Sequence, residues 1–203
     1  MTLVVAWRLN PYADRVQADV ARAQWRTVED LDADEIWSTL MGEGPGDREI
    51  VLDGTAVTRF GTTRGVAAAG CTLDPMPTMR VVDVVGLGLH GPRLPLWQTL
   101  LGTRRARSRA DDDEARARAV AGRTGIAAWV DRTAVDLPAP VGALVDVTRA
   151  VAGPPAALLL RRPDWLDPWV AAETRDVVAG EQRIHGFGVI EIARPSAGTL
   201  TRP

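Results

Sequence analysis

Two adjacent arginines end an apolar run in the last third of the sequence, and they are well placed to bind an anion. Arg161 and Arg162 directly follow Leu158–Leu160. The apolar run predicts a buried strand, and ligands of α/β proteins lie beyond the carboxyl ends of such strands. The pair could therefore hold a phosphate, a carboxylate or an acidic side chain of a partner. The sequence leaves equally open that both guanidinium groups are solvated or paired with acids of the same chain.

Residues typical of nucleophilic catalysis are scarce. His90 and His185 are the only histidines, and neither lies near a serine or cysteine in a recognisable nucleophile motif. Cys71 is the only cysteine, which excludes an internal disulfide bond and a cysteine-built zinc or iron–sulfur site. We interpret Cys71 as a small buried thiol, because a nucleophilic role requires a base beside it in space.

Two further patterns resemble binding motifs but lack the context those motifs need. The segment 86–91, Gly-Leu-Gly-Leu-His-Gly, matches the dinucleotide-binding pattern G-x-G-x-x-G. Pro92 and Pro95 follow at once and disfavour the helix that would bind a pyrophosphate, so we interpret the match as coincidence. The acidic run 111–114 lies between arginines at helical spacing, which predicts a solvated helix with salt bridges rather than a metal site.

The composition excludes whole classes of function. All 24 residues counted as lysine or arginine are arginine, so no lysine is available for a Schiff base or for binding a nucleotide phosphate. The formal net charge of −2 provides no net basic footprint, and we expect no nucleic-acid partner. No apolar run approaches the roughly 20 residues that a membrane span requires, so we expect a chain that does not span a membrane. The first residues also lack the pattern of a secretory signal.

Hydrophobic periodicity predicts an α/β fold. Helices are expected where apolar residues recur at helical spacing, and strands where short apolar runs end at turn residues. The segment 81–85 is compatible with a strand or with the first turn of a helix. The expected helices are 13–25, 32–41, 103–121, 144–151 and 169–179, and the expected strands are 49–54, 56–58, 65–70, 156–160 and 188–192.

Taken in order, these segments resemble an ATP-binding cassette (ABC) protein of the branched-chain amino acid transporter type. The segment 49–54, Glu-Ile-Val-Leu-Asp-Gly, is similar to the hairpin that follows the P-loop helix in that family. The segment 136–151 resembles the family's signature and the helix after it. The segment 157–163 falls where the family has its Walker B strand, and 166–168, Leu-Asp-Pro, matches the D-loop. The resemblance covers roughly residues 36–194.

This resemblance implies a fold and a division of the chain. We expect a P-loop NTPase-like core sheet covered by helices, with a small helical subdomain. The core is expected to be discontinuous, formed by residues 1–85 and 141–203. Residues 86–140 would then form the helical subdomain.

The family's P-loop positions carry unusual residues in this chain. The pattern G-x-x-x-x-G-K-[ST] falls on 27–34, with Ala33 at the lysine position and Asp34 at the Ser/Thr position. A P-loop binds phosphates through glycine backbone N–H groups and a cation, and both are missing here. Each acid would repel a phosphate about 4 Å away by roughly 1–4 kcal/mol. The acids are Glu29, Asp30, Asp32 and Asp34.

The other motif positions of the family also lack the residues that nucleotide binding and hydrolysis require. Arg161 and Arg162 replace the Walker B aspartate and the glutamate that acts as general base, and an arginine can neither hold Mg²⁺ nor accept a proton. We expect these arginines, together with Arg194, to pair with the acids of 27–34 across the ancestral site. The remaining changed positions are Cys71 at the Q-loop glutamine, Pro140 and Val141 at the signature Gly-Gln pair, and Arg194 at the switch histidine.

The resemblance therefore implies a pseudo-ATPase with no catalytic residue, no cofactor and no bound metal. We expect it to act by protein–protein interaction, as a regulatory or structural subunit paired with an active cassette or a permease. The family's groove for the permease would lie near residues 72–84. A cytoplasmic location follows, including peripheral attachment at the inner face of the membrane. Two alternatives remain open: an anion-binding protein or enzyme that uses Arg161, Arg162 and Arg194 in a remodelled pocket, and a scaffold subunit unrelated to transport.

Overall fold

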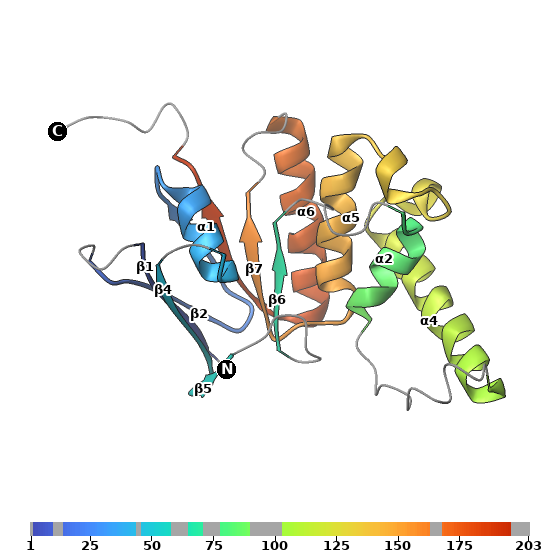
Figure 1. Cartoon of the computed structure of the whole chain (residues 1–203), viewed down its shortest axis with the longest axis horizontal. Coiled ribbons are helices and arrows are strands. Elements are labelled where there is room, and N and C mark those ends of the chain that lie inside the picture. The colour runs from blue at the N-terminus through green and yellow to red at the C-terminus, as the bar shows by residue number, and fades with distance from the viewer. Residues whose placement is uncertain are drawn as a thin grey trace.

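The computed structural model describes residues 2–9, 14–43, 46–57, 65–70, 78–89, 103–162 and 168–195. Its strands form two separate sheets, one antiparallel and one parallel, with helices packed around the parallel sheet (Figure 1). Within these residues, no helix combines the length and the apolar character needed to cross a bilayer.

The antiparallel sheet has the strand order β2-β1-β4-β5. Alternate residues of its central strand are buried, which gives the sheet one apolar face. The turn between β4 and β5 contains Asp53 and Gly54, both at positive φ, as expected for a hairpin with an Asp-Gly turn. The strands are β1 (Thr2–Arg8), β2 (Val16–Ala21), β4 (Asp47–Leu52) and β5 (Thr55–Ala56).

The parallel sheet has the strand order β3-β8-β7-β6. Its central strands are buried on both faces and are therefore almost continuously apolar. One strand, β8, lies between β3 and β7 and pairs with both. The strands are β3 (Trp25–Glu29), β6 (Val66–Ala69), β7 (Ala157–Arg161) and β8 (Gly188–Ala193).

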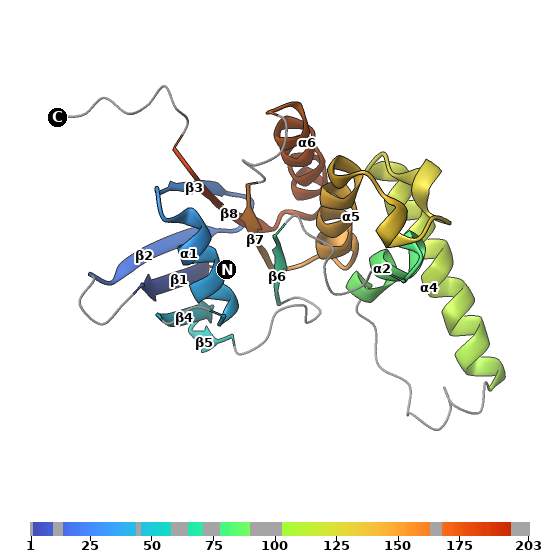
Figure 2. The ribbon, with the colours of Figure 1, turned by 45° about the horizontal axis from the view of Figure 1, so that its top comes forward.

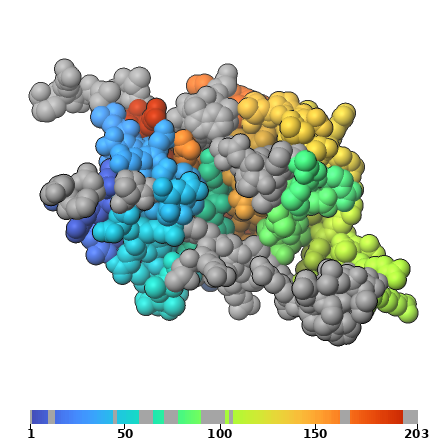
Figure 3. All heavy atoms as spheres, viewed as in Figure 1, coloured from blue at the N-terminus to red at the C-terminus, as the bar shows by residue number. Residues whose placement is uncertain are grey.

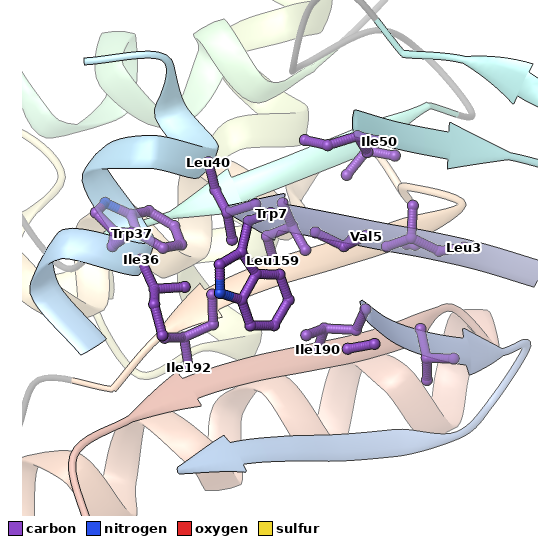
Figure 4. Packing of buried hydrophobic residues seen from close by; sticks show 14 of the residues in the cluster. Leu3, Val5, Trp7, Ile36, Trp37, Leu40, Ile50, Leu159, Ile190 and Ile192 are labelled. Carbon is purple, nitrogen blue, oxygen red and sulfur yellow. The ribbon is translucent and has the colours of Figure 1, made fainter. Parts of the chain in front are cut away.

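Helices and the second sheet cover the two faces of the parallel sheet. On one face, α1 (Ala33–Met41) and the antiparallel sheet bury Leu159, Ile190 and Ile192 (Figure 4). On the other face, α5 (Ala139–Ala152) and α6 (Pro168–His185) pack against Leu158, Leu160 and Val189. The alternation of side chains along each strand thus divides the core into two layers.

A third apolar cluster joins the remaining helices. It contains residues of α2 (Val81–Gly88), α4 (Arg104–Arg123) and the face of α5 that is turned away from the sheet. Two short 3₁₀ turns, Ala127–Trp129 and Ala134–Asp136, connect α4 to α5. In the space-filling view α2 and α4 lie at the end of the molecule opposite the antiparallel sheet (Figure 3). The proposed division into a core of 1–85 and 141–203 and a subdomain of 86–140 stays a prediction.

Most of the expected elements are present, and one is wrong. The expected helix over 13–25 is replaced by β2 and the start of β3. In β2 the buried residues are Ala18 and Val20, so the burial follows a period of two, and the strand pairs with β1 along its whole length. The segment 81–85, left open between strand and helix, forms the first part of α2.

Candidate functional site

The turn between β3 and α1 forms the candidate site, and it includes the segment 27–34. Ala33 is the first residue of α1 and is buried, whereas Asp34 has a side chain that is 48% exposed. Asp30 shapes the turn, because its carboxylate accepts a hydrogen bond from the backbone N–H of Asp32 at 3.0 Å. The backbone N–H of Asp30 donates to the carbonyl oxygen of Ala193 at 3.0 Å, which ties the turn to the end of β8.

Two arginines from neighbouring strand ends converge on the carboxylate of Asp34. Arg161, the last residue of β7, donates from Nη2 to one carboxylate oxygen at 2.6 Å. Arg194, which directly follows β8, contacts the other oxygen through its own Nη2. The expected pairing of strand-end arginines with an acid of 27–34 is therefore present at Asp34.

Arg162 points to the opposite face of the parallel sheet. Its side chain is 13% exposed and donates from Nε to Glu191 Oε1 at 3.0 Å and from Nη2 to Glu191 Oε2 at 3.3 Å. Its Nη1 lies 3.8 Å from a carboxylate oxygen of Glu29. Because successive side chains of a strand point to opposite faces, Arg161 and Arg162 cannot serve one common pocket.

Glu191, the main partner of Arg162, was not predicted from the sequence. Its side chain is 0% exposed and lies in the middle of β8. Besides Arg162, it accepts a hydrogen bond from the hydroxyl of Thr27 at 2.9 Å and one from the indole N–H of Trp25 at 3.2 Å. Arg175 of α6 lies 3.2 Å from the same carboxylate, and its guanidinium stacks over the Trp25 ring at 5.4 Å. A lone acid inside an apolar strand was the available signal.

This network determines the protonation of Glu191. Burial on its own favours the neutral carboxyl, but the hydrogen bond and charge of Arg162, with smaller contributions from Thr27 and Arg175, outweigh it. The pKa of Glu191 therefore lies below its ordinary value of 4.5. The carboxylate is charged at neutral pH and balances the cations that surround it.

We expect the network to make the fold sensitive to acid. Because the pKa is lower in the folded chain, the contribution of Glu191 to stability is complete above about pH 4.5 and is lost as the pH falls through the folded value. The difference in urea midpoint between the wild type and Glu191→Gln should therefore shrink from pH 6 to pH 3. Asp19→Asn, which alters an exposed pair with Arg26, is the matched control and should give a small difference at every pH. A Glu191→Gln difference that stays constant over this range would contradict the assignment.

The other predicted site residues do not join this arrangement. Pro140 lies in the first turn of α5, which packs on the face of the parallel sheet opposite to α1. Proline has no N–H to donate, so this helix start offers one donor fewer to an anion. His185 ends α6 and contacts Glu181. Cys71, His90 and much of the expected permease groove at 72–84 lie outside the described residues.

Metal binding receives no support from the part of the chain that the structure describes. No group of three or more His, Cys, Asp or Glu side chains there could hold a metal ion. The acidic run 111–114 lies on α4, as expected for a solvated helix, and two of its members, Asp113 and Glu114, pair with Arg109 and Arg118. Gly86 and Gly88 lie within α2, so they do not form a strand-to-helix turn for a dinucleotide.

Comparison with known proteins gives the fold a context. An ATP-binding cassette of an ABC transporter, solved in an ADP conformation, matches with a TM-score of 0.67 at 16% identity over 97% of this chain and 82% of that one. A Clostridium perfringens protein that is part of an ABC transporter complex matches with a TM-score of 0.65 at 16% identity, covering 96% of this chain and 78% of that one.

A nucleotide-free ATP-binding cassette from an ABC transporter gives a similar result. Its TM-score is 0.65 at 15% identity, and the match covers 98% of this chain and 83% of that one. No protein-family model and no curated protein matches the sequence. The likeness shows that the chain has the P-loop NTPase fold of ABC cassettes, and the predicted fold class is confirmed.

Proposed function

We propose that this chain is a pseudo-ATPase: a cassette-like subunit that does not bind or hydrolyse ATP and acts through protein contacts. The observation that carries the proposal is the reversed charge at the β3–α1 turn. P-loop NTPases hold Mg²⁺ between the Ser/Thr of the P-loop and an aspartate at the end of the Walker B strand. The resemblance assigns these two positions to Asp34 and Arg161, which pair directly at 2.6 Å.

At the end of β7, the guanidinium group of Arg161 supplies a positive charge where the family's aspartate would bind Mg²⁺. Arginine stays protonated and offers only donors, so Arg161 can neither coordinate Mg²⁺ nor order a water on it. The carboxylate of Asp34 neutralises the positive charge of Arg161, so this charge is not available to bind a triphosphate. The acids Glu29, Asp30 and Asp32 lie around the same turn, where glycine N–H groups and a lysine would be needed to bind phosphates.

Nucleotide titration tests the first half of the proposal. We expect no saturable binding of ATP–Mg²⁺ up to about 1 mM by calorimetry and no increase in melting temperature. A Kd of 10 μM would by contrast stabilise the fold by about 2.7 kcal/mol at 1 mM ligand, a rise of roughly 5–10 °C for a chain of this size. An ATP-binding cassette measured in parallel is the positive control. Saturable micromolar binding would overturn the proposal.

Copurification tests the second half. The tagged chain, isolated from its native host after gentle membrane solubilisation, should bring down a second ABC cassette or a permease in stoichiometric amount. This expectation rests on the fold and on the resemblance to branched-chain amino acid transporter subunits, and it places the chain in the cytoplasm or at the inner face of the membrane. Recovery of a stoichiometric complex with neither kind of protein would favour a scaffold unrelated to transport.

An anion-binding role is the weaker alternative. It requires the three arginines to meet in one open pocket, whereas Arg162 lies on the other face of the sheet and is held by Glu191. Arg161 and Arg194 do converge, but on the internal carboxylate of Asp34. Titration with sulfate or phosphate distinguishes the two proposals. The pseudo-ATPase proposal expects no saturable binding of either anion at this turn, whereas an anion-binding role requires it.

A further inference from the structure

A second concave site lies between the helices, away from the β3–α1 turn. It is a cavity of about 280 Å³ bounded by α4, by the ends of α5 and α6, and by Leu89 at the end of α2. Ala119 and Val120 of α4 form one apolar wall, and Ala152 and Pro154 at the end of α5 contribute another. The volume is just below the range of about 300–1,000 Å³ typical of small-molecule sites.

Two arginines flank the apolar wall of α4. Arg116 and Arg123 are seven residues apart, which is two helical turns, so both lie on the face that Ala119 and Val120 share. Their backbones are separated by about 10 Å along the helix axis. The cavity therefore combines an apolar surface with a guanidinium group near each end of that surface.

The two arginines differ in how their charge is balanced. Arg123 donates from Nε and Nη2 to the two carboxylate oxygens of Glu181, at 3.0 and 3.1 Å, and Glu181 is buried. His185 Nε2 lies 3.3 Å from the same carboxylate. Arg116 is exposed and has no ion pair with any residue in the part of the chain that the structure describes. Among the described residues, the cavity thus has one guanidinium group without a carboxylate in direct contact, that of Arg116.

The ends of two helices affect where a charged group is favourable in this cavity. α5 and α6 both end at the cavity, and the last carbonyl groups of a helix carry partial negative charge. An anionic group is therefore disfavoured beside Ala152 and favoured beside Arg116. An apolar group is suited to the wall formed by Ala152 and Pro154.

We propose that this cavity binds a small organic monoanion, a carboxylate with an apolar tail of about six to ten carbons, anchored at Arg116. The carboxylate accepts hydrogen bonds from the guanidinium group of Arg116, and the tail lies along Ala119 and Val120. The site is separate from the β3–α1 turn and does not depend on whether the chain binds nucleotide.

The probes are sodium octanoate, octylamine and 1-octanol, which share a tail and differ in charge. We expect saturable octanoate binding in NMR titration, with backbone amide shifts clustered at residues 116–123 and 152–154. Octylamine and 1-octanol should bind at least about tenfold more weakly, because the site carries a positive charge and a carboxylate can pair with it. Equal binding of octanoate and octylamine would overturn the proposal.

Variants test the two halves of the site. Arg116→Gln should weaken octanoate at least about fivefold, and Ala119→Leu should weaken it by filling the cavity. Both positions are on the exposed side of α4, so the fold should be retained, as amide spectra will show. Arg104→Gln removes an exposed arginine of the same helix outside the cavity and should leave the Kd within about twofold. An Arg116→Gln variant that binds octanoate as tightly as the wild type would refute the anchor.

Discussion

Replacing Glu191 with leucine is expected to lower the free energy of unfolding by about 3–5 kcal/mol. The substitution removes the carboxylate that balances Arg162, whose side chain is only 13% exposed. A largely buried guanidinium that loses its nearest carboxylate costs far more than one favourable contact, because the cation cannot recover its full hydration. Arg175 is 46% exposed and can turn to solvent, so the loss should come chiefly from Arg162.

Urea denaturation of three variants checks this expectation. Glu191→Leu combined with Arg162→Leu removes both charges and should recover part of the lost stability, since apolar replacements of a complete buried pair are often tolerated. Asp19→Ala breaks an exposed pair with Arg26 and should cost less than about 1 kcal/mol. The assignment of Glu191 as a structural counter-charge fails if Glu191→Leu loses no more than Asp19→Ala.

Trp7→Ala is expected to destabilise the fold by a similar amount, about 3–5 kcal/mol. Trp7 is 2% exposed and lies on β1, with its indole between α1 and the parallel sheet. In Figure 4 it points toward Ile36 of α1 and Ile192 of β8. Its removal therefore leaves a cavity where three layers meet, and the surrounding side chains can close it only in part.

Thermal unfolding gives the readout for this second substitution. A loss of 3–5 kcal/mol corresponds to a fall in melting temperature of roughly 6–20 °C for a chain of about 200 residues. Trp169→Ala is the matched control, because Trp169 is 67% exposed and its truncation should change stability by less than about 1 kcal/mol. Equal losses from the two tryptophan variants would show that the junction between the sheets does not hold the fold together.

Buried strands and long helices were the most predictable parts of this fold. The run 156–160 and the segment 188–192 became β7 and β8, because a strand covered on both faces must be apolar throughout. Helix boundaries were less accurate. α5 begins at Ala139, five residues before the expected start, because its first turn is only partly buried and carries a weak apolar pattern. Such a turn gives periodicity little to detect.

The wrong helix over 13–25 shows how tertiary pairing overrides a local pattern. Its charged and small residues allow helical spacing, but β2 gains a full ladder of partners from β1 and buries Ala18 and Val20. In the rotated view β1 and β2 lie side by side at the edge of the molecule (Figure 2). The residues 13–25 do not by themselves show that β1 is available as a pairing partner, so their local pattern was not sufficient to predict a strand.

The candidate site was predictable where the family resemblance aligned its segments and unpredictable where the contacts depend on the register of the sheet. The resemblance placed the acids of 27–34 opposite the strand-end arginines, and Arg161 and Arg194 do contact Asp34. The environment of Glu191 could not be predicted in the same way, since its partners are contributed by β3, α6 and the residue after β7. Which face of β8 carries Glu191 follows only from the register of the whole sheet.

Arg161 at the end of β7 and Arg162 directly after it lie on opposite faces of the sheet, so different neighbours constrain what can replace each of them. An acidic residue at 161 would face Asp34 beside partly exposed Arg194, where water can screen the repulsion. An acidic residue at 162 would meet the fully buried carboxylate of Glu191, with no solvent to separate two like charges. Lineages that carry glutamate at 162 should therefore lack an acid at 191, and the two positions should co-vary in any set of homologous sequences.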